Sequence, residues 1–149
     1  MAAVFLDTSA LVRRYFQPEP GANRVRAVCA PSRGHALLLA RLAAVELAAA
    51  LNRRVREGTL TRQGRDRRWR AFGIHWLNQY EVVEATDRIY RAAEPLVFRY
   101  PLRALDALQL ASAVAAAAGI AGASFQFWTA DRQQADAARG EGLVVELLP

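Results

Sequence analysis

Short apolar runs alternate with longer amphipathic segments along the whole chain. Runs that are rich in apolar residues and bounded by turn residues are typical of buried β-strands. Five such runs are present, at residues 3–7, 35–40, 81–85, 124–129 and 143–147. The first of them ends at Asp7 and the fourth ends at Thr129, so polar side chains follow apolar strands at both places.

The segments between these runs have the periodicity of helices. In residues 43–57, for example, Ala44, Leu47 and Leu51 fall on one stripe, and Gly58 follows as a helix terminator. Helices are predicted at residues 9–16, 22–30, 43–57, 61–79, 87–99, 103–118 and 132–140.

Alternating strands and helices imply βαβ units. Such units give a three-layer α/β/α architecture with a mainly parallel, five-stranded sheet between helices. No repeat, low-complexity segment or linker interrupts the pattern, and 149 residues is the length of one domain. The sequence therefore predicts a single domain over residues 1–149.

Composition narrows the cellular setting. The chain has one cysteine, Cys29, so no disulfide can form within it, and no apolar run approaches the length of a membrane span. The N-terminal segment lacks a basic region, and Asp7 interrupts its apolar stretch. We expect no signal peptide, no membrane contact and a cytoplasmic location.

The net charge is +6, and all 20 basic residues are arginine. Arginine binds phosphate through two parallel hydrogen bonds, which favours a polyanionic partner. An Ala- and Arg-rich composition also follows from a GC-rich genome, so composition leaves both explanations open. The absence of lysine excludes a Walker lysine, a Schiff-base lysine and any other catalytic lysine.

Four acidic residues are candidates for chemistry. Asp7 and Asp131 follow predicted strands, at the sheet edge where α/β proteins bind ligands, although each is also a good helix N-cap. Glu46 lies among small apolar residues of a helix, and Asp106 lies in the first turn of another. A surface position for Glu46 and a helix-dipole role for Asp106 explain each acid singly.

Taken together, the four acids suggest a different role. Carboxylates that converge repel one another and need a cation to stay ionised. Oxygen ligands of this kind suit Mg²⁺ or Mn²⁺. Spacing along the chain does not show convergence, so the residues alone indicate no more than an acidic pocket.

Four segments in order resemble the motifs of the PIN-domain family, in particular the VapC toxins of toxin–antitoxin pairs. The resemblance covers nearly the whole chain, and the third segment is the most specific. The segments are Phe5-Leu-Asp-Thr-Ser-Ala-Leu-Val12, Ala44-Val-Glu-Leu-Ala-Ala-Ala-Leu51, Tyr100-Pro-Leu-Arg-Ala-Leu-Asp-Ala-Leu-Gln-Leu-Ala-Ser-Ala113 and Trp128-Thr-Ala-Asp-Arg-Gln-Gln-Ala-Asp-Ala-Ala-Arg-Gly-Glu-Gly142.

The resemblance implies a five-stranded parallel sheet flanked by helices and a metal-dependent ribonuclease. Its four catalytic acids correspond to Asp7, Glu46, Asp106 and Asp131, with Asp7 and Asp106 as direct ligands of Mg²⁺ or Mn²⁺. Glu46 and Asp131 would complete the ligand set, bind a second ion or orient the attacking water. The hydroxyls of Ser9 and Thr129 would hold carboxylates or metal-bound waters.

The same resemblance implies partners. These are an RNA substrate, a VapB-like antitoxin that covers the acidic pocket, and a second copy of the chain in a homodimer. The helices at residues 9–16 and 43–57 are the candidate antitoxin surfaces. One departure is Leu39-Ala-Arg-Leu-Ala43, where relatives often carry a small hydroxyl residue, and Arg41 receives no role.

Arginines also cluster over residues 53–70. They form either an RNA-phosphate track or a solvated helix face; a track predicts RNA affinity that falls steeply with salt. The aromatic residues Trp69, Phe72 and Trp76 are expected in the core or an interface, as is Leu77. His35 and His75 are expected to be structural, because two histidines and one cysteine give little support for zinc.

Three other functions compete with the ribonuclease. A haloacid-dehalogenase-like phosphatase usually needs a second aspartate two residues after the first, where this chain has Ser9. A response-regulator receiver needs a lysine, which is absent. A catalytically silent PIN module that binds RNA or protein remains the alternative, and it predicts no carboxylate-dependent Mn²⁺ binding.

Overall fold

A computed structural model describes residues 1–16, 18–120 and 124–149. Five strands form one sheet: β1 (Ala2–Leu6), β2 (Ala36–Ala40), β3 (Tyr80–Val83), β4 (Ser124–Thr129) and β5 (Val144–Leu147). Their order is β3-β2-β1-β4-β5, and every neighbouring pair is parallel. The predicted parallel, five-stranded α/β architecture is confirmed.

The helices lie close to their predicted positions. The largest difference is the segment predicted at 22–30, which ends at Val28 and is followed by a short 3₁₀ turn, Pro31–Arg33, that begins at a proline. The α-helices are α1 (Thr8–Tyr15), α2 (Ala22–Val28), α3 (Ala43–Arg56), α4 (Arg62–Asn78), α5 (Asp87–Arg99), α6 (Ala104–Gly119) and α7 (Arg132–Gly140).

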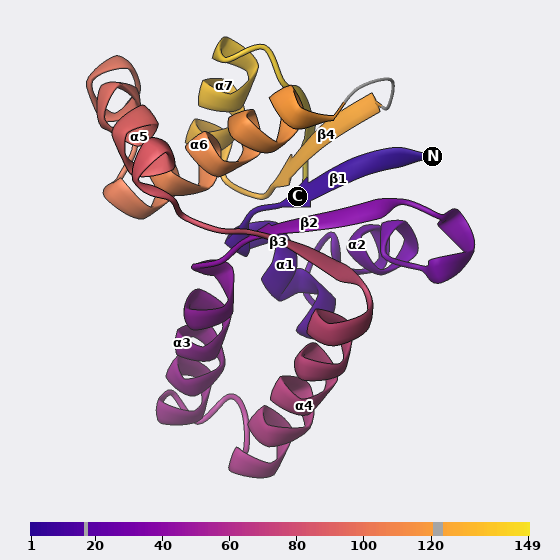
Figure 1. Cartoon of the computed structure of the whole chain (residues 1–149). Helices are drawn as coiled ribbons and strands as arrows, with labels where there is room; N and C mark the ends of the chain where they lie inside the picture. The colour runs from indigo at the N-terminus through magenta and orange to yellow at the C-terminus, as the bar shows by residue number, and fades with distance from the viewer. Residues whose placement is uncertain (17, 121–123) are drawn as a thin grey trace.

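Helices cover both faces of the sheet, with α5, α6 and α7 on one side and α1 to α4 on the other (Figure 1). The central strand β1 shows why. Val4 and Leu6 belong to the apolar core beneath α1 and α3, whereas Ala3 and Phe5 belong to the core beneath α6. Because strand side chains alternate, a strand that is apolar throughout buries both faces.

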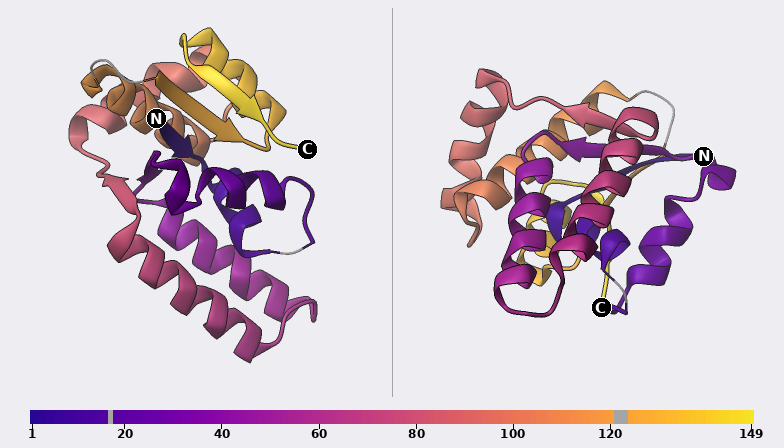
Figure 2. Two further views of the ribbon diagram at one scale, coloured as in Figure 1. Left: turned by 90° about the vertical axis from the view of Figure 1, so that its right-hand side faces the viewer. Right: turned by 90° about the horizontal axis from the view of Figure 1, so that it is seen from below.

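Beyond the sheet, α3 and α4 run side by side away from it (Figure 2). Phe72 of α4 is buried in the core and Trp76 packs against it, as expected for core aromatics. Trp69 and Leu77 are exposed, which leaves an interface role open for them. Within the described ranges, no helix is both long and apolar enough to cross a membrane.

Both histidines take part in structural hydrogen bonds, as expected. Nδ1 of His35 accepts a hydrogen bond from the backbone N–H of Ala2 at 3.0 Å. The His75 ring lies 2.7 Å from the hydroxyl of Tyr15, which also contacts the hydroxyl of Tyr80 at 2.9 Å. Partial burial and the nearby Arg14 lower the pKa of His75, which favours the neutral form of this ring.

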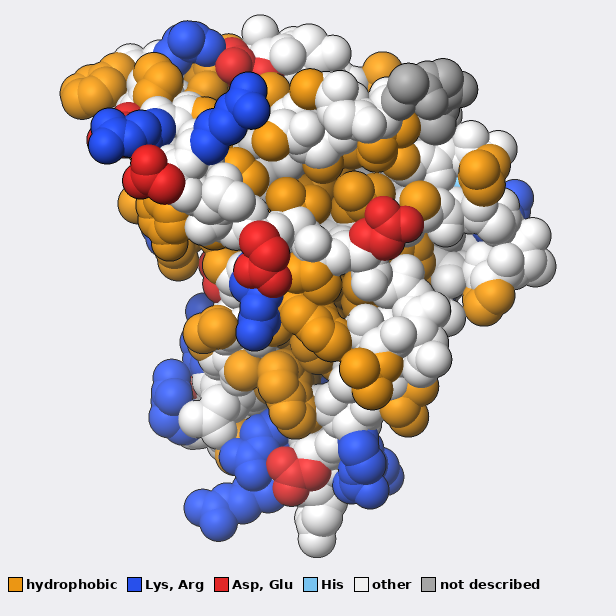
Figure 3. All heavy atoms as spheres, viewed as in Figure 1, with side chains coloured by type: hydrophobic (Ala, Val, Ile, Leu, Met, Phe, Trp, Pro, Cys, Tyr) orange, Lys and Arg blue, Asp and Glu red, His pale blue; other side chains and the backbone are white. Residues whose placement is uncertain are grey.

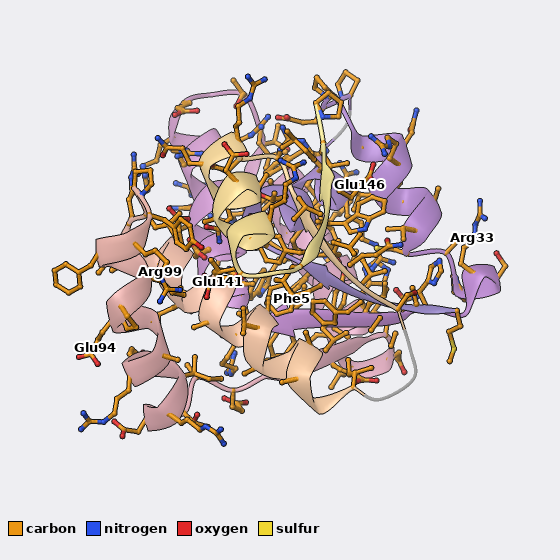
Figure 4. The ribbon with its side chains drawn as sticks, turned by 90° about the horizontal axis from the view of Figure 1, so that it is seen from above. Phe5, Arg33, Glu94, Arg99, Glu141 and Glu146 are labelled. Carbon is orange, nitrogen blue, oxygen red and sulfur yellow. The ribbon has the colours of Figure 1, made fainter. Side chains whose placement is uncertain are left out.

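A second set of polar contacts ties α5 to the end of α7. Arg99 pairs with Glu141 at 2.7 Å, and Figure 4 shows the two side chains next to each other. The hydroxyl of Tyr100 donates to the same carboxylate at 2.6 Å. These contacts help to fix the helices that carry two of the candidate acids, because α6 begins at Ala104, shortly after Tyr100, and Asp131 is the N-cap of α7.

Candidate metal centre and nucleic-acid cleft

Asp7 lies at the carboxyl end of β1 and caps α1. Its Oδ1 accepts hydrogen bonds from the backbone N–H of Ala10 at 2.9 Å and from the hydroxyl of Ser9 at 2.6 Å. Its Oδ2 accepts from the hydroxyl of Thr129. Asp7 is therefore the helix N-cap that the sequence predicts, and it also lies at the edge of the sheet where α/β proteins bind ligands.

Thr129 and Ser9 connect the ends of the two central strands. The hydroxyl of Thr129 also accepts from the backbone N–H of Asp131 at 3.0 Å, and that of Ser9 accepts from Ala130 at 2.8 Å. The two hydroxyls lie 3.1 Å apart. Thr129 is fully buried, so its hydrogen bond to Asp7 is shielded from water.

Removal of the Thr129 hydroxyl tests this connection. Thr129→Val keeps the shape of the side chain but deprives Asp7 Oδ2 and the Asp131 N–H of a buried partner. We expect the free energy of unfolding to fall by about 1–3 kcal/mol, measured by urea denaturation. Thr129→Ser keeps the hydroxyl and is the control. A larger loss in Thr129→Ser than in Thr129→Val would show that the methyl group, not the hydroxyl, matters.

Asp131 and Asp106 occupy the starts of α7 and α6. Asp131 is exposed and caps α7, accepting from the backbone N–H of Gln134 at 3.1 Å. Asp106 is half-buried in the first turn of α6. The buried side chain of Gln134 donates to the backbone oxygen of Asp106 at 2.9 Å, which joins the two helix starts.

Glu46 lies in the first turn of α3 and is half-buried. Its Oε1 accepts from the hydroxyl of Thr8 at 2.7 Å and from the side-chain amide of Gln109 at 3.1 Å. The same amide nitrogen lies 2.7 Å from the Thr8 hydroxyl. Glu46 is therefore not a free surface acid, and its hydrogen bonds link α3 to α1 and α6.

Sequence reasoning missed Thr8 and Gln109. Gln109 is 2% exposed and lies within the buried stretch from Ala107 to Ala113 of α6. A long polar side chain in such a stretch was the available signal, because buried amides need partners. Its Oε1 has no hydrogen-bond partner among the described residues.

All four acids line one cleft of about 770 Å³, at the edge of the sheet where the strands end. Arg41, which received no role, is not among its described lining residues; it lies 3.9 Å from Glu84 and over the ring of Trp76. The polar and charged lining consists of Asp7, Thr8, Ser9, Arg13, Glu19, Glu46, Arg53, Arg54, Arg56, Asp106, Gln109 and Asp131.

The arginine cluster at 53–70 is divided between surfaces. Arg53, Arg54 and Arg56 at the end of α3 line the acidic cleft, and Arg54 pairs with Glu19. Arg65 instead pairs with Asp66 at 2.9 Å. Figure 3 shows arginine side chains gathered around the free ends of α3 and α4. The cluster is therefore not one continuous track.

The carboxylates influence one another. Burial raises the pKa of Asp7 to about 6, with Asp106 adding to the rise, although hydrogen bonds from Ser9 and Thr129 oppose it. Burial also raises the pKa of Asp106, and the charges of Asp131 and Glu46 raise it further. Both aspartates would be stabilised as anions by a cation in the cleft.

The donor set fits a hard divalent cation, with one restriction. Among the described residues, no three acidic, histidine or cysteine side chains are close enough to form a metal site by themselves. Mg²⁺ usually keeps several waters and binds proteins through one or two carboxylates. The oxygen-only lining and the mutually repelling acids are compatible with such a water-rich site.

Fold and site define a class: a three-layer α/β protein with an acidic cleft at the carboxyl ends of parallel strands. The family model for the PIN domain matches residues 4–140, and the chain belongs to that family. No curated protein matches the sequence.

Solved structures share the fold at low sequence identity. The structure of VapC20 from Mycobacterium tuberculosis, described as a sarcin–ricin loop cleaving toxin, is 19% identical, with a TM-score of 0.67 over 99% of this chain and 100% of that one. VapBC2 from Rickettsia felis, bound to promoter DNA, is 12% identical, with a TM-score of 0.65 over 98% and 99%. FitAcB from Neisseria gonorrhoeae is 14% identical, with a TM-score of 0.55 over 95% of each chain.

Proposed function

We propose that this protein is a VapC-like endoribonuclease that hydrolyses RNA phosphodiester bonds with the help of Mg²⁺ or Mn²⁺. One observation carries the proposal. Acids from four separate segments, Asp7, Glu46, Asp106 and Asp131, line a single cleft together with arginines of α1 and α3. Membership of the PIN family and the sarcin–ricin loop cleavage attributed to VapC20 support it.

Asp7 and Asp106 would hold the metal, because they combine burial with mutual repulsion. When bound, an ion of this kind would supply positive charge that stabilises a negatively charged phosphate oxygen, and it would lower the pKa of a water molecule beside it. Ser9 and Thr129 fix both oxygens of Asp7. Thr8 and Gln109 hold one oxygen of Glu46, which would orient the attacking water through the other.

The arginines at the cleft would bind the RNA backbone on either side of the cut. Arg13 is held in place because it donates to the backbone oxygen of Ser9 at 2.8 Å. Arg53 and Arg56 reach the cleft from the end of α3. Guanidinium groups bind phosphate oxygens through paired hydrogen bonds, and this contact carries no sequence information.

Two protein partners belong to the proposal: a VapB-like antitoxin and a second copy of the chain. The apolar side chains of Val12 on α1 and Val45 on α3 line the cleft beside the acids, and Val45 is 70% exposed. An antitoxin segment lying there would cover both the acids and these apolar groups. On α5, Phe98 is 92% exposed and offers an apolar surface for the homodimer. A cytoplasmic location suits this role, and the one cysteine, Cys29, is free and buried.

The proposal is tested with the purified protein, calorimetry and RNA. We expect Mn²⁺ to bind and to support endonucleolytic cuts in total RNA, and a chelator to stop cleavage without unfolding the protein. A silent PIN scaffold predicts neither metal binding nor cleavage. RNA binding without any Mn²⁺ uptake would favour that alternative.

A further inference from the structure

A second cavity, of about 660 Å³, lies on the other side of α1 from the acidic cleft. It is formed by the end of α1, the end of α2 and the middle of α4, which all lie on the same side of the sheet (Figure 1). We call it the arginine cavity. Its described lining consists of Arg14, Tyr15, Arg26, Cys29, Ala30, Pro31, Arg67, Arg68, Ala71 and His75.

The lining carries four arginines and, among the described residues, no aspartate or glutamate. Arg14 and Arg68 donate to neutral acceptors, whereas arginines elsewhere, for example Arg24, Arg54 and Arg99, each pair with a carboxylate. His75, which also lines the cavity, has a lowered pKa that favours its neutral form, so the positive charge here comes from the arginines. The arginine cavity, which is open to solvent, is therefore a region of concentrated positive charge that attracts anions.

Two of these guanidinium groups are held in place by neutral acceptors. Arg14 donates to the hydroxyl of Tyr80 and to the side-chain oxygen of Gln79, both at 2.6 Å. Arg68 donates to the backbone oxygens of Tyr15 at 2.8 Å and Gly64 at 3.0 Å. A neutral acceptor orients a guanidinium group but leaves its positive charge uncompensated. An anion that binds there is attracted by that charge, and little side-chain entropy is lost because the arginines are already ordered.

Arg67 completes the cavity from α4. It is exposed, unlike Arg14 and Arg68, which are partly buried. A phosphate that entered between these groups would meet two fixed cations and one that can close over it. A planar guanidinium group can donate two parallel hydrogen bonds to two oxygens of one phosphate. Phosphate therefore fits these groups better than an anion with a single acceptor atom.

We infer that the arginine cavity binds a backbone phosphate of RNA outside the segment that is cut. The presence of a phosphate site follows from the cavity itself, whereas RNA as its source rests on the function proposed above. The consecutive residues Arg13 and Arg14 line the acidic cleft and the arginine cavity respectively. One RNA strand passing around α1 would meet both sites.

The length of α1 sets the size of RNA that can reach both. Its eight residues extend about 12 Å at 1.5 Å per residue. Stacked nucleotides advance by about 3.4 Å each, so a strand that follows α1 from Asp7 at its start to Arg14 near its end covers roughly four nucleotides. A 4-mer centred on the acidic cleft extends only about two nucleotides to either side and would therefore miss the arginine cavity, whereas a 16-mer would occupy it.

Charge reversal at Arg67 tests the inference on the whole protein. Arg67→Glu is compared with Arg70→Glu, because Arg70 is an exposed arginine of the same helix that lines neither site. Binding of fluorescent oligouridine is measured by anisotropy in a chelator, where no cleavage occurs. A competition format gives the affinity of the 4-mer.

We expect Arg67→Glu to weaken 16-mer binding about tenfold and to reduce the salt slope by about 0.7 for one lost phosphate contact. The affinity of Arg67→Glu for the 4-mer should stay near that of the unaltered protein. Arg70→Glu should bind both oligonucleotides about as tightly as the unaltered protein. NMR signals of the Arg14 and Arg68 Nε–H groups should shift when the 16-mer is added.

Several outcomes would overturn the inference. Equal losses of 16-mer affinity in both variants would indicate that binding depends only on the overall positive charge of the protein. No loss of 16-mer affinity in Arg67→Glu would exclude the site. Shifts of the Arg14 and Arg68 signals with inorganic pyrophosphate, but not with RNA, would replace RNA by a small phosphate ligand. Binding is measured without metal and so does not depend on cleavage. If the protein binds RNA in this way but never cuts it, the proposed ribonuclease function is refuted and the inferred phosphate site still stands.

Discussion

Replacement of Asp7 by asparagine is expected to reduce Mn²⁺-dependent RNA cleavage by more than about 1000-fold, since loss of even one preorganised hydrogen-bond donor can cost about 100- to 1000-fold. Asparagine has nearly the same shape and is also a favoured N-cap, so α1 keeps its start. The substitution removes the charge and one acceptor oxygen of a carboxylate that is 4% exposed and lines the acidic cleft.

The same substitution elsewhere provides the control. Asp136 of α7 is an exposed acid that pairs with Arg139 at 3.2 Å and is not among the described residues of the acidic cleft. Asp136→Asn should leave cleavage unchanged, whereas Asp106→Asn should behave like Asp7→Asn. Circular dichroism and calorimetry with Mn²⁺ show whether a variant has lost its fold or only its metal. Undiminished cleavage by folded Asp7→Asn would remove the metal-centre assignment.

Much of the fold could be predicted because its signals are local. The strands of this sheet are short apolar runs between turn residues, and the run that became β1 is buried on both faces. The prediction was less accurate where the geometry of a turn sets the end of a helix. The helix expected to reach Ala30 ends at Val28, ahead of the turn that starts at Pro31.

The candidate site was predictable to different degrees. The strand-end rule placed Asp7 and Asp131 at the correct edge of the sheet. Glu46 and Asp106 lie on helices, and only the family resemblance grouped them with the other two. Their neighbourhood depends on the packing of α1, α3 and α6, which are far apart along the chain.

Contacts between distant polar residues have no local signature. Gln109 and Thr8 are separated by 101 positions, yet they share a hydrogen bond beside Glu46. The arginines of residues 53–70 appear continuous in the sequence, but α3 and α4 direct them to different surfaces. Helix packing, rather than spacing, decides which charges meet.

The burial of Asp7 leads to a second large effect, on stability. Its pKa of about 6 in the folded protein exceeds the ordinary value of 3.8, mainly because burial disfavours the anion. The folded state therefore holds this proton more tightly than the unfolded state. Stability from the protonated group is complete below pH 3.8 and is lost as the pH rises through about 6.

Asp7→Asn should consequently stabilise the metal-free protein near neutral pH. The difference between the two pKa values corresponds to roughly 3 kcal/mol at pH 7. Rearrangement of the Thr129 hydrogen bond should offset about 1–2 kcal/mol of that. Urea denaturation in a chelator should therefore give a net gain of about 1–2 kcal/mol at pH 7.

The pH and metal dependence of this gain separate a buried charge from a change in packing. At pH 4.5 most of the gain should be gone, since the carboxyl of Asp7 is then protonated in the folded protein. Excess Mn²⁺ at pH 7 should reverse the order, because a ligand that binds only the folded state stabilises it, and the asparagine variant lacks the charge that holds the ion. A difference in stability that stays constant from pH 4.5 to pH 7, with or without Mn²⁺, would contradict the view that an ionised Asp7 destabilises the fold until a cation binds.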